Sequence, residues 1–128
     1  MINPDPRLTL IFHSDDFRIY LVDAFVIRSS TESEDAVDFA LGGHAYRYDF
    51  IPENEIWIEP VTHQEDQEYN TGHEILERGL QKSFRMCYNK AHEKAVRFER
   101  IIRRAKVKDP IRCAIDILEI LSKRKLVK

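Results

Sequence analysis

The hydrophobic pattern of the chain changes its period near residue 60, and this change constrains the fold more than any other feature. Before it, short apolar runs with two-residue alternation are separated by turn residues, as expected for β-strands. After it, apolar residues recur every three or four positions, as in helices that bury one face. Because the strands come first and the helices last, the sequence predicts an α+β fold.

The first 60 residues predict an antiparallel sheet of about four to five strands. Gly42 and Gly43 interrupt one of the runs, and Pro60 ends the last one. We expect this last run, "EIWIE", to lie at an edge of the sheet. The predicted strands are "RLTLIFH" at 7–13, "FRIYLV" at 17–22, "AFVIRS" at 24–29, "DFALGGHAYRYDFI" at 38–51 and "EIWIEP" at 55–60.

Three helices are predicted after the strands, at 66–83, 90–106 and 110–124. Asn89 precedes the second helix and is a good N-cap residue. The core stripe of the second helix is predicted to be Ala91, Ala95, Phe98 and Ile102. Gly79 lies inside the first helix, where glycine costs about 1 kcal/mol relative to alanine. Close packing at this position would explain why a glycine is present.

The third predicted helix has a broad apolar surface. Asp109 supplies its N-cap, Pro110 occupies its first position, and only a narrow polar stripe runs from Arg112 to Lys123. Such a surface must be covered, either by the rest of the chain or by a second copy in a two-fold dimer. We therefore divide the sequence into an α+β core domain at 1–108 and a C-terminal helix at 109–128, and we expect a homodimer.

The composition argues against several classes of partner. The formal net charge of −2 gives no overall field that would attract nucleic acid or an anionic membrane. Basic residues do cluster between Arg97 and Lys108, but helices often carry them in their last turn.

The apolar runs are too short to span a membrane, and we expect no signal peptide. Cys87 and Cys113 are too few for a disulfide framework, so a cytoplasmic protein is expected.

The segment His73-Glu74-x-x-Glu77 in the first predicted helix has the spacing of half a metal site. Residues at i and i+4 share one face of a helix, so His73 and Glu77 can bind the same cation. Zinc accepts imidazole nitrogen and carboxylate oxygen at about 2.0 to 2.2 Å. In metallohydrolase helices of the H-E-x-x-H type, the glutamate after the first histidine accepts a proton from water. The pattern therefore predicts Zn²⁺ as cofactor, His73 and Glu77 as ligands and Glu74 as the catalytic base.

A third ligand has to come from another element. His92 is the best candidate, because it begins the next predicted helix and two antiparallel helices can bring it near His73 or Glu77. Glu99 follows His92 on the same helix stripe and is an additional candidate. His44 follows the glycine pair and could reach the site from the sheet.

A helix with a solvated charged face explains the same residues without a metal. Glu74 and Arg78 stand at i and i+4, the usual spacing of an exposed ion pair. His73 would then be a polar residue at the edge of the core. The pattern is short and arises by chance in a glutamate-rich chain, so the sequence leaves both interpretations open.

Three segments together resemble a family of short bacterial and phage proteins that has no assigned activity. They are "GGHAYRYDFIPENEIWIE" at 42–59, "HEILERGLQK" at 73–82 and "YNKAHEKAVRFE" at 88–99. The resemblance implies similarity to minimal zincin-like metallopeptidases. It also implies that the polar positions of interest are His44, His73, Glu74, Glu77 and His92.

Two functions follow from these observations. The first is a metal-dependent hydrolase, most simply a peptidase that aligns an extended substrate on the "EIWIE" strand. The alternative is a non-catalytic interaction module that homodimerises through its C-terminal helix. The sequence does not separate an active enzyme from a relative that has kept the scaffold and lost the chemistry.

Overall fold

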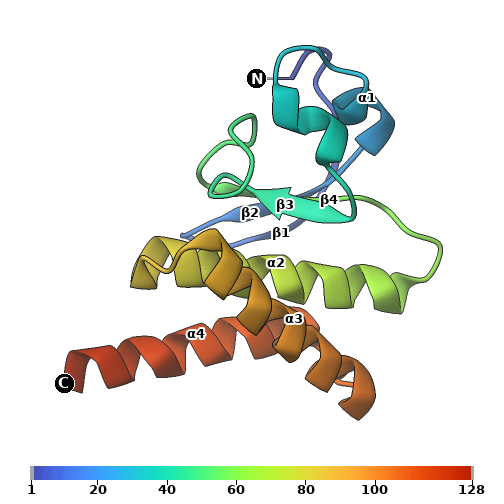
Figure 1. The fold of residues 1–128 in the computed structure, drawn as a ribbon. Coiled ribbons are helices and arrows are strands. Elements are labelled where there is room, and N and C mark those ends of the chain that lie inside the picture. The colour runs from blue at the N-terminus through green and yellow to red at the C-terminus, as the bar shows by residue number, and fades with distance from the viewer. Residues whose placement is uncertain (1, 128) are drawn as a thin grey trace. The chain divides into compact units, whose positions relative to one another are not determined.

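The computed structural model describes the backbone of residues 2–127 and the side chains of residues 2–124. Within this range the chain forms a four-stranded sheet followed by three long helices, which confirms the α+β class (Figure 1). Contacts divide the chain into two compact units, Met1–Gln67 and Glu68–Lys128. None of the helices in the described range is both long enough and apolar enough to cross a membrane.

The sheet of the first unit has the strand order β1-β2-β4-β3, with β1 at Arg7–His13, β2 at Arg18–Val22, β3 at Gly42–His44 and β4 at Glu55–Ile58. The pairs β1–β2 and β3–β4 are antiparallel, as predicted, but the central pair β2–β4 is parallel. The connection at 23–54 explains the difference. It carries the chain away from β2 and returns it in the same direction, which a tight hairpin cannot do.

The position of β4 corrects a second prediction. "EIWIE" was expected at an edge of the sheet, where it could align an extended substrate, but β4 lies between β2 and β3. Both sides of its backbone are therefore occupied by neighbouring strands. Ile56, Trp57 and Ile58 have no exposed surface, which is typical of an interior strand.

Two predicted strands are wrong in whole or in part. Residues 24–29 were predicted as a strand, but α1 forms at Ala24–Arg28 because the carboxylate of Asp23 accepts hydrogen bonds from the first backbone N–H groups of the helix. In the run predicted at 38–51, only Gly42–His44 is strand. A 3₁₀ helix precedes it at Glu34–Asp38, and turns follow it. Local caps and turns outweigh the β propensity of these residues.

Aromatic side chains form much of the core of the first unit. The ring centroids of Phe39 and Tyr48 are 5.5 Å apart, and Phe50 lies 6.1 Å from Trp57. A Cβ atom at Gly43 would approach the Tyr48 ring to 2.6 Å, so a side chain at this position would displace the ring. Trp57 is a core residue, as the sequence predicted.

Three helices make up most of the second unit, namely α2 at Gln64–Phe84, α3 at Tyr88–Ala105 and α4 at Pro110–Val127 (Figure 1). All three agree with the predicted helices to within a few residues. α3 begins earlier than predicted, with Cys87 rather than Asn89 at the N-cap. The cap of α4 is confirmed, because the carboxylate of Asp109 accepts a hydrogen bond of 3.0 Å from the backbone N–H of Arg112.

Two glycines on one face of α2 allow α4 to approach closely. A Cβ atom at Gly79 would lie 2.5 Å from Cδ1 of Leu118, and one at Gly72 would lie 3.1 Å from the carbonyl oxygen of Pro110. The expectation of close packing at Gly79 is therefore confirmed. Because α4 packs against α2, part of its apolar surface is covered within the chain. The homodimer stays a prediction.

We expect Gly79→Val to lower the free energy of unfolding by about 1 to 3 kcal/mol, because the added side chain collides with Leu118. Urea titration of the wild type and the variant measures the change. Leu118→Ala added to Gly79→Val should cost less than the sum of the two single changes, since the smaller side chain makes room. Strictly additive effects would show that Gly79 and Leu118 do not constrain each other.

Candidate metal centre

Helices α2 and α3 present polar side chains to each other along one face of each helix. Three pairs connect them: Asn70 with Arg103, His73 with Glu99, and Glu77 with His92. The residue numbers of the partners in α3 fall as those in α2 rise, so the two helices run antiparallel. The α2 members stand at i, i+3 and i+7, which places them on a single face.

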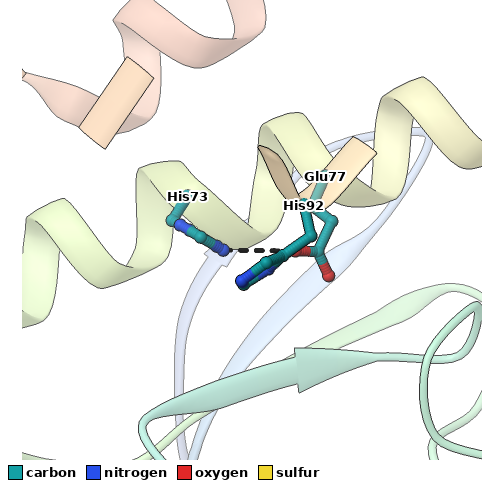
Figure 2. A group of neighbouring side chains, drawn as sticks. All are labelled: His73, Glu77 and His92. Atoms are coloured by element: carbon teal, nitrogen blue, oxygen red, sulfur yellow. Dashed lines mark hydrogen bonds and ion pairs between the residues drawn. The ribbon is translucent and has the colours of Figure 1, made fainter. Parts of the chain in front are cut away.

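The side chains of His73, Glu77 and His92 point toward one another (Figure 2). Nε2 of His73 lies 3.2 Å from Oε2 of Glu77, and Nδ1 of His92 lies 2.8 Å from the same oxygen. The two imidazole ring centroids are 5.2 Å apart. One donor atom from each residue falls within 4.8 Å of the other two, so the three predicted ligands do converge.

The spacing of these donor atoms is close to that required around a small cation. Ligands at about 2.0 to 2.2 Å in tetrahedral positions are separated from one another by roughly 3.3 to 3.6 Å. The measured separations of 3.2 and 2.8 Å at Glu77 are slightly shorter, as expected where the same atoms share hydrogen bonds. Two imidazoles with one carboxylate are a donor set of catalytic zinc sites, which leave a fourth position open.

The α2 residues of this site are buried, so the solvated-face interpretation of α2 is wrong, whereas His92 on α3 is half-buried. Glu77 is 2% exposed, His73 7% and Glu74 9%. Arg78, the expected partner in a surface ion pair, is 2% exposed. Burying several ionisable groups together is costly unless they pair with one another or bind a cation. The sequence could not show this burial, because a polar stripe looks the same on a wet face and in a polar interior.

Glu74 lies beside the three donor atoms. Its Oε2 is 3.9 Å from Nε2 of His73, which is the nitrogen that faces Glu77. Burial raises the pKa of Glu74 to about 8, and the charges of Glu77 and Glu99 act in the same direction, while His73 partly opposes them. A carboxyl group with a pKa near neutrality, adjacent to a site that can hold a cation, is suited to proton transfer.

Glu99 contacts the other nitrogen of the His73 ring. Its Oε1 lies 2.9 Å from Nδ1 of His73, an ion-pair contact in which the N–H direction is not fully aligned for a hydrogen bond. Its Oε2 accepts a hydrogen bond of 2.8 Å from Nε of Arg103. Glu99 was predicted as an additional site residue, and in the structure it stands behind His73 rather than among the three donor atoms.

Carboxylates on both sides of the ring set the protonation of His73. Burial by itself would lower the pKa of His73, but the contacts with Glu77 and Glu99 outweigh it and raise the pKa to about 10. Burial by itself would raise the pKa of Glu99, but its contacts with His73 and Arg103 outweigh burial and lower the pKa. In the absence of a cation, His73 is therefore an imidazolium that both carboxylates stabilise.

Two residues of the site were missed by the sequence reasoning. The Tyr88 ring stacks on His92 with centroids 5.3 Å apart, and its hydroxyl oxygen lies 3.4 Å from Nδ1 of His92. Arg103 joins Glu99 to Asn70 and lies over the Tyr69 ring. The i,i+4 spacing of Tyr88 with His92, and of Glu99 with Arg103, was the available signal.

His44 belongs to the first compact unit, in β3. It has no exposed surface, and its Nδ1 accepts a hydrogen bond of 3.2 Å from the backbone N–H of Tyr46. A role for His44 in the site stays a prediction.

No protein-family model, curated protein or solved structure matches the chain. The resemblance to short bacterial and phage proteins stays a prediction.

In the metal-free protein, we expect the free energy of unfolding to fall as the pH rises from about 7 to 10. The pKa of His73 is raised from 6.5 to about 10 on folding, so its stabilisation is complete below 6.5 and is lost as the pH passes 10. Glu74, raised from 4.5 to about 8, acts in the same direction. The lowered pKa of Glu99 matters only below its ordinary value of 4.5. Urea titrations at several pH values with a chelator present measure the slope.

The control for this experiment is the pair His73→Ala and His63→Ala. Removing His73 should flatten the pH dependence, whereas removing His63, an exposed residue just before α2, should leave it unchanged. A steep slope that survives in His73→Ala would assign the dependence to another group.

Proposed function

We propose that the face shared by α2 and α3 binds a divalent cation, with zinc as the best fit, through His73, Glu77 and His92. One observation carries the proposal: donor atoms from two different helices, two imidazole nitrogens and one carboxylate oxygen, lie within 4.8 Å of one another, and two of the three residues are buried. Imidazole nitrogens favour zinc and similar transition metals over calcium or magnesium, which prefer oxygen ligands.

The donor set and its neighbour support hydrolysis as the reaction, most simply of a peptide. Zinc in a site with three protein ligands supplies a coordinated water with a pKa of about 7 and polarises a carbonyl group. Glu74 is placed to accept the proton, because its Oε2 lies 3.9 Å from the ligand nitrogen of His73 without being one of the three donor atoms. A carboxylate base is sufficient when the water is already this acidic.

The same contacts also describe a site that holds the helices together without a metal. Oε2 of Glu77 lies within hydrogen-bonding distance of both imidazoles, so the cluster is a polar network between the helices as well as a candidate ligand set. The two descriptions differ in one measurable quantity, the affinity for zinc.

The wild type is expected to bind one zinc ion per chain, and His92→Ala should weaken binding by more than about 100-fold, the upper effect seen for groups that only support a ligand. Metal analysis of the purified protein and competition with a coloured chelator give the stoichiometry and the affinity. His63→Ala is the matched control, since His63 is exposed and lies outside the cluster. Equal zinc binding by the wild type and His92→Ala would refute the assignment.

A separate test addresses catalysis. Glu74→Gln should keep its zinc, because Glu74 is not one of the three donor atoms, but should lower the rate of peptide hydrolysis by about 10² to 10⁴. A peptide library, incubated with the zinc-loaded proteins and read by mass spectrometry, measures cleavage. Cleavage at the wild-type rate by Glu74→Gln would remove Glu74 from the reaction, and loss of zinc would make it a ligand instead.

A further inference from the structure

The His73 ring is held at both of its nitrogen atoms by groups from different helices. Nε2 faces Glu77 within α2, whereas Nδ1 faces Glu99 of α3. A neutral imidazole has one N–H and one lone pair, and a metal binds only the lone pair. Whichever group fixes the proton on Nδ1 therefore decides whether Nε2 is free to coordinate.

Glu99 is suited to fix that proton because its own position is fixed. Its two oxygen atoms have different partners: Oε1 faces Nδ1 of His73 at 2.9 Å, and Oε2 accepts from Nε of Arg103 at 2.8 Å. Arg103 is held in turn, since it donates to Oδ1 of Asn70 at 3.2 Å and lies 4.8 Å from the centroid of the Tyr69 ring. The carboxylate is thus anchored on the side away from the histidine.

We propose that Glu99, anchored by Arg103, is a positioning residue that sets the tautomer and the orientation of His73 for cation binding. The inference rests on the proposed function, because it assigns a role around the same cation. It differs from a ligand role: Glu99 contacts Nδ1, and the three convergent donor atoms come from His73, Glu77 and His92. Outer carboxylates of this kind hold a ligating imidazole in place and increase its basicity.

In the Glu99→Gln variant, Arg103 determines which end of the new amide group faces His73. The guanidinium offers only N–H groups, so it requires the amide oxygen of the new side chain. The amide NH₂ must then face His73, where it can only donate to Nδ1. This moves the ring proton to Nε2, the nitrogen that would bind the cation. Glu99→Gln leaves the side-chain volume almost unchanged. It is expected to move the proton of the neutral His73 ring from Nδ1 to Nε2.

We expect Glu99→Gln to bind zinc 10- to 100-fold more weakly than the wild type, as measured by chelator competition. Two-dimensional ¹H–¹⁵N spectra of each metal-free protein, recorded at a pH high enough for its His73 ring to be neutral, should show the proton on Nδ1 in the wild type and on Nε2 in the variant. Glu93→Gln is the matched control, because Glu93 is an exposed glutamate on the same helix. Arg103→Met is a second variant, which should weaken zinc binding in the same direction but by less.

The outcomes separate this inference from the proposed function. Wild-type zinc affinity in Glu99→Gln, with His92→Ala still defective, would overturn the positioning role and leave the metal site standing. An altered cobalt absorption spectrum in Glu99→Gln, showing a lost ligand, would make Glu99 a ligand and also overturn it. Failure of the wild type itself to bind zinc would refute both. Weaker binding with an unchanged cobalt spectrum and a reversed tautomer supports the positioning role.

Discussion

The contact of a single carboxylate oxygen with two imidazoles is the interaction on which the candidate site depends. Oε2 of Glu77 lies 3.2 Å from a nitrogen of His73 in its own helix and 2.8 Å from a nitrogen of His92 in the next. The first contact follows from the helix period, and the second requires α3 to lie antiparallel to α2. Because Glu77 is almost fully buried, its carboxylate needs polar partners within the protein or a bound cation, and the two imidazoles are such partners.

Further polar side chains of α2 and α3 surround this contact. His73, Glu77 and His92 supply the convergent donor atoms, and Glu74 lies beside them with a raised pKa. At the other nitrogen of the His73 ring lies Glu99, which in turn accepts a hydrogen bond from Arg103. A ligand set supported by its own outer groups is what metal sites require and what a surface ion pair lacks.

Much of the second unit could be predicted from the sequence, because the hydrophobic period and the capping residues of a helix lie within the helix or next to it. The three helices to within a few residues at each end, the cap at Asp109 and close packing at Gly79 were expected from the sequence, although α3 begins earlier than expected. The sheet was less predictable. Residues 24–28 have the composition of a strand but form a helix capped by Asp23, and the parallel pairing of β4 depends on a long connection. Strand order is a non-local property, and no short segment encodes it.

The sequence by itself determined that strands precede helices and that His73 and Glu77 share a face, because the helix period alone fixes which residues of one helix are neighbours. Only the tertiary structure decided that the charged stripe is buried, that His92 joins the pair, and that Glu99 meets the opposite nitrogen of His73. These outcomes depend on how α3 is placed against α2. That placement follows from the packing of whole helix faces, which is summed over many residues and cannot be read from the spacing of a few.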